Sequence, residues 1–164
     1  MLFETARLYV IQWKKEDLNS LYQLFNDEAI KEFILPRLTI EETENIFNNQ
    51  LNDYGNKFPF GRYFIVEKES NEFIGLLLLK KTDDENAIEI GYSLIKKYWK
   101  KGYATEIVQS CIQWLFQRER FSAIFAVTET DNVNSQNVLF RCGFYQQENI
   151  LEDGKAMSLF SLEK

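Results

Sequence analysis

The sequence predicts an α/β fold with a mixed sheet of about seven strands and about four helices, in one domain spanning residues 1–164. Segments with alternating or continuous apolar residues, typical of strands, occur among segments whose apolar residues recur every three or four positions, typical of helices. Turn-forming residues separate these segments, and the chain contains neither an internal repeat nor a Ser/Gly-rich linker. The expected order is β-α-α-β-β-β-α-β-α-β-β.

The beginning of the chain is expected to form one strand and two helices. Alternating apolar residues place the strand in residues 5–13. The first helix is expected to start at Lys14, because apolar residues follow at helical spacing: Leu18, Leu21, Tyr22 and Phe25. The second is expected from Thr39 to Tyr54, with Thr39 and Glu42 forming a capping box.

Three strands are expected next, in residues 61–68, 72–81 and 87–95. The run from Phe73 to Leu79 is apolar at consecutive positions, which predicts a strand covered on both faces of a sheet. The third strand alternates, with Glu89, Gly91 and Ser93 on the face opposite to Ile88, Ile90, Tyr92 and Leu94.

The last part of the chain begins with a helix whose apolar stripe is nearly ideal: Ala104, Ile107, Val108, Cys111, Ile112 and Leu115. A strand follows in residues 122–129, and then a short helix from Ser135 to Cys142 that Gly143 ends. A strand pair completes the fold, and Asp153–Gly154 is a strong signal for the hairpin turn between its strands. These strands are expected in residues 144–151 and 155–162.

Histidine is absent from all 164 residues. Its absence excludes Ser-His-Asp and Cys-His nucleophile systems and removes the commonest transition-metal ligand, so no metal is expected. Proton transfer must then fall to Glu, Asp, Tyr, Lys or water. The formal net charge of -6 disfavours direct nucleic-acid binding, whose affinity comes mainly from phosphate neutralisation, and favours a cationic substrate.

The sequence favours a cytoplasmic protein without a membrane partner. No apolar run approaches the roughly 20 residues that span a bilayer, and residues 1–4 do not resemble the start of a signal peptide. Cys111 and Cys142 lie in helix-like patterns, so we expect reduced core thiols and not a disulfide. With no imidazole to activate them, they are not expected to act as nucleophiles.

The junction "WKKGYAT", Trp99 to Thr105, predicts an anion site. The first N–H groups of a helix lack internal partners, and the helix dipole places partial positive charge there. Gly102 would let the main chain approach a ligand closely, because no Cβ stands in the way. A diphosphate carries enough charge to use these amides, the Thr105 hydroxyl and the ammonium groups of Lys100 and Lys101.

Three segments together resemble the GNAT superfamily of acetyl-CoA-dependent N-acetyltransferases, and more narrowly its RimJ/RimL-type branch of protein N-terminal acetyltransferases. They are "EIGYSLIKKYWKKGYATE" (Glu89–Glu106), "DNVNSQNVLFRCGF" (Asp131–Phe144) and "ETARLYV" (Glu4–Val10). The resemblance covers essentially the whole chain. It implies a single GNAT-like domain with a mostly antiparallel sheet, and acetyl-CoA as co-substrate.

The resemblance also implies where coenzyme A binds. Gly102 and Ala104 match two defined positions of the family's diphosphate loop, whereas Trp99 replaces the usual Gln or Arg and leaves Lys100 and Lys101 to supply positive charge. A strand end pairs with the pantetheine arm, and Asn132 matches an asparagine that hydrogen-bonds this arm. The expected cofactor-binding residues are Ser93, Leu94, Ile95, Lys100, Lys101, Gly102, Tyr103, Ala104, Thr105 and Asn132.

The expected reaction is direct attack of an amine on the acetyl thioester. Glu89 is the candidate base, acting through an ordered water, and Glu148 is a second candidate. By resemblance, Ser135 lies near the sulfur. Leu139 stands where many family members carry a tyrosine that protonates the leaving thiolate, so that role falls to Ser135, to water, or to no group.

The expected acceptor is the α-amine of a protein or peptide N-terminus. A basic acceptor protein would suit the acidic charge of this chain. Three alternatives stay open: acetylation of a small amine, such as a polyamine or an aminoglycoside; a coenzyme A-binding regulator that has lost catalysis; and a pure interaction module that uses the helix at Gly102. The sequence does not distinguish a monomer from a homodimer.

Overall fold

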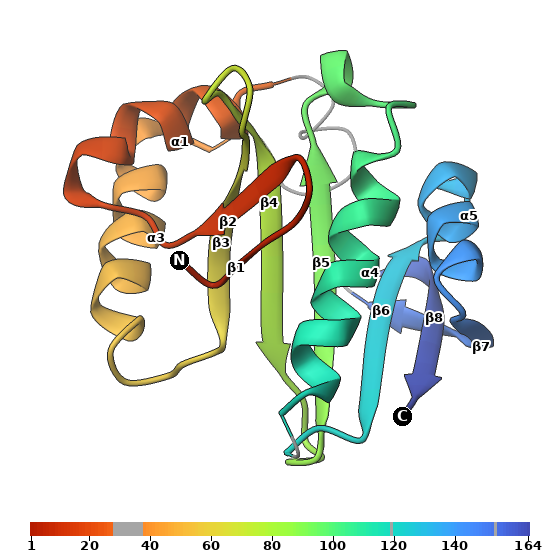
Figure 1. Ribbon diagram of the computed structural model, residues 1–164. Coiled ribbons are helices and arrows are strands. Elements are labelled where there is room, and N and C mark those ends of the chain that lie inside the picture. The colour runs from red at the N-terminus through yellow and green to blue at the C-terminus, as the bar shows by residue number, and fades with distance from the viewer. Residues whose placement is uncertain (28–37, 119, 153) are drawn as a thin grey trace. The chain divides into compact units, whose positions relative to one another are not determined.

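The computed structural model describes residues 1–27, 38–118, 120–152 and 154–164. Within them, strands and helices alternate in nearly the expected order (Figure 1). The strands are β1 (Phe3–Glu4), β2 (Leu8–Ile11), β3 (Gly61–Glu67), β4 (Phe73–Lys81), β5 (Ala87–Leu94), β6 (Ala123–Glu129), β7 (Tyr145–Glu152) and β8 (Lys155–Glu163). The α-helices are α1 (Leu18–Phe25), α3 (Ile40–Asp53), α4 (Tyr103–Phe116) and α5 (Val133–Arg141), and two short 3₁₀ helices cover Lys15–Asp17 and Lys96–Tyr98.

The strands form an eight-stranded sheet in the order β1-β2-β3-β4-β5-β6-β8-β7. Pairing is antiparallel between β1 and β2, β2 and β3, β6 and β8, and β7 and β8, whereas β5 and β6 run parallel. The expectation of a mostly antiparallel mixed sheet is therefore confirmed, with one strand more than expected. This strand is β1, whose two residues are too few to show a periodic pattern.

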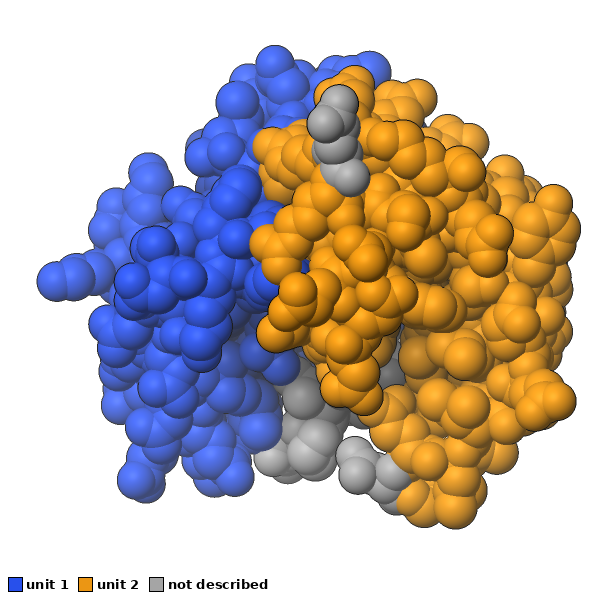
Figure 2. Space-filling view, turned by 90° about the horizontal axis from the view of Figure 1, so that it is seen from below, with its two compact units in different colours: residues 1–78, 92–101 blue, residues 79–91, 102–164 orange. Residues whose placement is uncertain are grey.

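The chain divides into two compact units (Figure 2). Unit 1 contains residues 1–78 and 92–101, and unit 2 contains residues 79–91 and 102–164. Strands β4 and β5 each begin in one unit and end in the other.

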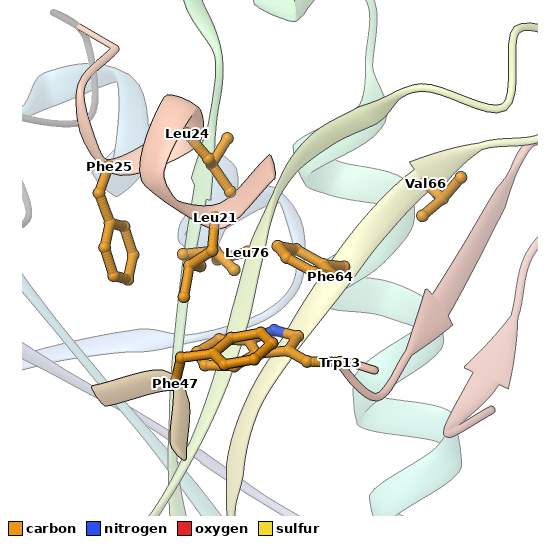
Figure 3. Packing of buried hydrophobic residues seen from close by; sticks show 8 residues of the cluster. All are labelled: Trp13, Leu21, Leu24, Phe25, Phe47, Phe64, Val66 and Leu76. Atoms are coloured by element: carbon orange, nitrogen blue, oxygen red, sulfur yellow. The ribbon is translucent and has the colours of Figure 1, made fainter. Parts of the chain in front are cut away.

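The core of unit 1 is an aromatic and aliphatic cluster (Figure 3). The Trp13 ring stacks on Phe47 of α3, with 5.6 Å between ring centroids and 8° between planes, and lies 5.5 Å from the Phe64 ring of β3. Leu21 and Phe25 of α1 are fully buried beside them. Leu21 and Phe25, two of the periodic apolar residues that predict α1, are therefore among the residues that bury this helix.

Helix α3 begins with the predicted capping box. The Thr39 hydroxyl accepts a hydrogen bond from the Glu42 amide at 3.1 Å, and the Glu42 carboxylate accepts one from the Thr39 amide at 2.7 Å. The hydrogen bond from the Thr39 amide, together with that from its hydroxyl, lowers the pKa of Glu42 below its ordinary value.

In unit 2, most of the predicted stripe of α4 is buried, namely Ile107, Val108, Cys111 and Leu115, while Ala104 and Ile112 are half-buried. Both cysteines are free, and burial raises the pKa of the Cys111 thiol to about 12 and that of Cys142 to about 11. Strand β8 pairs with all seven residues of β6. In strand β7 the register shifts between Gln146 and Asn149, a bulge that the sequence did not reveal.

Two further expectations need adjustment. Helix α5 starts two residues before Ser135, because the Asn132 side chain caps it. The alternation along β5 holds for Ile88 to Gly91 but then ends, since Ser93 and Leu94 are both buried. Asp153, one residue of the predicted turn, lies outside the described residues, and Gly154 has a φ of 77°.

No helix in the described parts of the chain is both long and apolar enough to cross a membrane. The described residues also contain no group of three or more Cys, Asp or Glu side chains arranged to hold a metal ion.

Candidate active site

Helix α4 begins at a glycine, without a side-chain cap. Gly102 is the N-cap residue, with a φ of 82°, and it offers no side chain to cap the helix. Internal hydrogen bonding of α4 starts where the Glu106 amide donates to the Gly102 carbonyl at 3.1 Å. Amides in the first turn precede any internal acceptor, so an anion is a natural partner for them. The predicted residues Tyr103, Ala104 and Thr105 form this turn.

The segment before Gly102 belongs to unit 1 and is held by several side chains. Lys100 has a φ of 60°, unusual for a residue other than glycine, and Lys100 and Lys101 are both exposed. The Arg7 guanidinium donates a hydrogen bond to the Lys101 carbonyl at 3.1 Å. The Lys101 ammonium lies 5.0 Å from the centroid of the Tyr98 ring.

Glu72, in the turn between β3 and β4, anchors the same segment further upstream. Its carboxylate accepts hydrogen bonds from the Tyr98 hydroxyl and, at 2.9 Å, from the Lys97 ammonium. The hydrogen bonds from Tyr98 and Lys97 lower the pKa of Glu72. A carboxylate that stays charged into acidic conditions keeps both anchors in place.

The end of β5 is shaped by a close backbone approach. A Cβ added to Gly75 of β4 would lie 2.0 Å from the Ser93 carbonyl oxygen, a separation that no other residue type tolerates. The Leu94 carbonyl accepts a hydrogen bond from the Trp99 indole at 2.6 Å. Trp99, the departure from the family's Gln or Arg, therefore ties the loop to the strand end.

The main chain of Ile95 already has partners inside unit 1. Its amide donates to the Ile74 carbonyl at 2.9 Å, and its carbonyl accepts from the Tyr98 amide at 2.9 Å. Both main-chain groups of Ile95 therefore already take part in hydrogen bonds.

In unit 2, the pairing between β5 and β6 stops early. The registered pairs run from Ala87–Ala123 to Glu89–Phe125, although β6 continues to Glu129 and β5 continues through Ile90. Main-chain groups past the last pair are the kind that an extended ligand uses when it adds to a strand edge.

The start of α5 places two further predicted residues. The Asn132 side-chain oxygen accepts from the Ser135 amide at 3.1 Å, and both residues are half-buried. The side-chain Nε2 of Gln136 donates to the carbonyls of Glu129 and Thr130, which holds the connection from β6. Leu139 is 1% exposed, so this position contributes only apolar packing.

Glu89 is half-buried in β5 and pairs with Lys80 of β4. The Lys80 ammonium lies 3.2 Å from a Glu89 carboxylate oxygen and 3.6 Å from one of Glu152. Burial alone would lower the pKa of Lys80, but the two carboxylates outweigh burial and raise it. Glu148, the second candidate base, lies in the exposed β7 bulge between Gln146 and Asn149.

The predicted residues divide between the two units. Unit 1 holds Ser93, Leu94, Ile95, Lys100 and Lys101, whereas unit 2 holds Glu89, Gly102, Tyr103, Ala104, Thr105, Asn132 and Ser135. Within unit 2, the Cys142 sulfur at the end of α5 lies 3.9 Å from the Thr105 carbonyl oxygen, so α5 packs beside the first turn of α4.

Sequence reasoning missed Gly75, Arg7 and Glu72. A glycine inside an apolar strand is a signal for close backbone approach, so Gly75 could have been found. Arg7 and Glu72 act on residues 94 and 26 positions away, respectively, and no local pattern marks them.

Comparison with known proteins identifies the family. Residues 7–145 match the family described as Acetyltransferase (GNAT) domain. The chain belongs to the GNAT family. A relative, the uncharacterized N-acetyltransferase p20 of Bacillus licheniformis, is 31% identical over 152 residues, which cover 91% of this chain and 84% of that protein.

Solved structures share the GNAT fold. RimL, a ribosomal L7/L12 α-N-protein acetyltransferase in complex with coenzyme A, has a TM-score of 0.82 at 15% identity, over 99% of this chain and 97% of that one. A spermidine N-acetyltransferase from Vibrio cholerae, in complex with coenzyme A and spermine, has a TM-score of 0.79 at 16% identity, over 95% of each chain. The protein is thus an N-acetyltransferase that uses acetyl-CoA.

Proposed function

We propose that this GNAT enzyme acetylates the α-amino group of a protein or peptide N-terminus, with the main chain from Lys100 to Thr105 holding the diphosphate of coenzyme A. The main observation that supports this site is the start of α4, which has no side-chain cap and directly follows two exposed lysines in the sequence. A helix end contributes about 0.3–1 kcal/mol, and one hydrogen bond to a charged group about 1.5–3 kcal/mol. Micromolar affinity needs about 8 kcal/mol, so several amides must act together.

The rest of the cofactor would lie along the end of β5. Gly75 allows the approach of the Ser93 carbonyl, and the end of the β5–β6 ladder leaves a strand edge to which an extended pantetheine arm can add. Asn132 and Ser135 would lie along this arm. Acetyl-CoA supplies an acetyl thioester, which the neutral amine attacks directly.

Two residues are proposed to handle protons. Glu89 would take the proton of the incoming ammonium through an ordered water, since a carboxylate only accepts hydrogen bonds when ionised. Lys80 fixes the orientation of this carboxylate through its ion pair. Ser135 would donate to the leaving sulfur, because Leu139 offers no hydroxyl.

The proton demand favours an α-amine. An α-amino group, with a pKa near 8, is roughly a tenth neutral at pH 7, whereas a lysine side chain, with a pKa near 10.4, is neutral in less than about one part in a thousand. A site without histidine and without a hydroxyl at position 139 suits the amine that loses its proton more readily.

A small polyamine is the second candidate, and the acidic balance of the chain favours it. The net charge of -6 attracts a polycation at least as well as a basic peptide.

Competition between acceptors distinguishes an N-terminal α-amine from a polyamine as the preferred substrate. The enzyme and isotope-labelled acetyl-CoA are given an equimolar mixture of a lysine-free peptide, the same peptide with a blocked N-terminus and one lysine, and spermidine. Mass spectrometry then measures the label on each. We expect the free N-terminus to gain most of it. Label mainly on spermidine would overturn the N-terminal assignment in favour of the small amine.

A further inference from the structure

We propose that Arg7 is a positioning residue for the diphosphate loop: by holding the Lys101 carbonyl, it orients the amide of Gly102 toward the ligand. The inference rests on the proposed diphosphate site at the start of α4. It assigns a function to the first strand region, which has none in the proposal above.

Arg7 is presented from a well-fixed turn between β1 and β2. The Thr5 amide donates to the Leu8 carbonyl at 2.9 Å, and the Thr5 hydroxyl accepts from the Leu8 amide at 2.9 Å and from the Arg7 amide at 3.3 Å. The Arg7 carbonyl accepts from the Lys68 amide at 2.9 Å. The backbone that carries the guanidinium is therefore held by its own turn and by the end of β3.

The contact acts on one particular peptide unit. The carbonyl of Lys101 and the N–H of Gly102 belong to the same planar trans peptide, so they point in opposite directions. Fixing the carbonyl on Arg7 therefore also fixes the direction of the Gly102 N–H.

This peptide unit needs an external anchor. Gly102, with a φ of 82°, carries no side chain that could restrict it, and glycine has the widest choice of backbone conformations. Glu72 holds Lys97 and Tyr98, which lie further upstream, and Trp99 holds Leu94. The Arg7 guanidinium contacts the peptide joined to Gly102 directly, through the Lys101 carbonyl. When an amide is already oriented before the ligand binds, the entropy cost of ordering it on binding is smaller.

The test compares acetyl-CoA with acetyl-pantetheine, which carries the same thioester but no diphosphate. In Arg7→Ala, we expect calorimetry to show a Kd for acetyl-CoA about fivefold weaker, because the Gly102 amide is no longer oriented before the ligand binds. The kcat/KM for acetyl-pantetheine and the kcat at saturating acetyl-CoA should stay within about twofold of the original protein. Arg7→Lys keeps a donor and should recover part of the affinity.

Lys68→Ala is the matched control, because it also removes a positive charge from this region but contacts Glu4 and the Tyr9 ring and not the loop. It should bind acetyl-CoA normally. The inference is overturned if Arg7→Ala binds acetyl-CoA as tightly as the original protein, if Lys68→Ala weakens it equally, or if acetyl-pantetheine suffers as much as acetyl-CoA. The last result would make Arg7 a general structural residue.

Gly102→Val, measured in parallel, separates this inference from the proposed function. Full affinity of Gly102→Val would remove the diphosphate site itself, and the Arg7 inference with it. Loss of binding in Gly102→Val with normal binding in Arg7→Ala would remove only the Arg7 inference. If Arg7→Ala does not fold, Arg7→Met, which also lacks the guanidinium, is compared with Arg7→Lys. Full affinity of Arg7→Met for acetyl-CoA, together with unchanged kinetics with acetyl-pantetheine, would overturn the inference.

Discussion

Leu139 shows how a single side chain narrows the chemistry of a site. It is buried and apolar, so this position of α5 cannot protonate a leaving thiolate. The nearest proposed substitute, Ser135, lies one helical turn earlier and is half-buried. Its ordinary hydroxyl is a weak acid, and any catalytic benefit must come from a hydrogen bond that forms as charge develops on the sulfur.

Ser135→Ala should therefore lower kcat by about tenfold and weaken acetyl-CoA binding by a smaller factor. Steady-state kinetics combined with calorimetry measures both quantities. Ser110→Ala on α4 is a suitable control, because it removes a hydroxyl from a residue that is not among those proposed for the site. A change in affinity without a change in kcat would make Ser135 a cofactor contact and not an acid.

Glu89→Gln should slow the reaction most at low pH. There the acceptor amine is largely protonated and depends on a base, whereas at high pH a larger fraction is already neutral. The measurement is kcat/KM against pH for both proteins. Glu152→Gln provides the control, since Glu152 also contacts Lys80 but is not a candidate base. Parallel pH profiles for the original protein and Glu89→Gln would remove Glu89 from the mechanism.

At the scale of elements, the connection from β5 to α4 is held by side-chain hydrogen bonds along its length but has no side-chain cap where the helix starts. Trp99 ties it to Leu94 and Glu72 ties it to Tyr98, while Gly102 leaves the helix start without a side-chain cap. A helix that begins in this way lacks the stabilisation of a side-chain cap, about 1 kcal/mol. Its first main-chain amides can instead donate hydrogen bonds to an anionic ligand.

Gly102→Val should nearly abolish acetyl-CoA binding, because a β-branched side chain is strained at a φ of 82° and blocks the approach of an anion. Gly154→Val separates these causes: Gly154 has a φ of 77° and open space around it, so the backbone strain is similar but the proposed site is untouched. Calorimetry should show normal binding for Gly154→Val. Equal losses in both variants would mean that strain alone is responsible.

Gly75→Ala should weaken acetyl-CoA binding and lower the thermal midpoint, because the added methyl meets the Ser93 carbonyl at 2.0 Å and forces β4 and β5 to shift. The expected loss of stability is about 2 kcal/mol, in the range of overpacked cores. Gly55→Ala is the control, with no atom within 4 Å of the added carbon. Normal binding by a stable Gly75→Ala would show that the strand end does not contact the cofactor.

At the scale of the whole molecule, elements with a clear period could be predicted and contacts distant in sequence could not. The apolar stripe that places α4, and the capping box of Thr39 and Glu42, are local signals that the structure confirms. Strand β1 and the β7 bulge carry no such signal, because their pairing is set by neighbouring strands.

The candidate site follows the same division. Gly102 and its neighbours could be proposed from a local motif, whereas the Lys80–Glu89–Glu152 ion pairs and the Arg7 contact depend on how distant segments meet. Register between strands, which places Lys80 beside Glu89, is a property of the folded sheet and not of either strand alone.

The net charge of -6 leads to a prediction for the whole enzyme. Attraction of a cationic acceptor is screened by salt, over a Debye length of about 8 Å at physiological ionic strength. The kcat/KM for a peptide with basic residues after its N-terminus should therefore fall several-fold between low and high salt. An acidic peptide with the same N-terminal residue should show the opposite trend or none. Identical salt dependence for both peptides would exclude electrostatic steering.

The two free thiols, Cys111 buried and Cys142 half-buried, have a practical consequence for enzymology. Disulfide-exchange dyes react with thiolates, and pKa values of about 12 for Cys111 and about 11 for Cys142 leave almost no thiolate at neutral pH. Free coenzyme A liberated during turnover can thus be followed continuously with such a colour reagent, because the folded enzyme contributes little background until it unfolds.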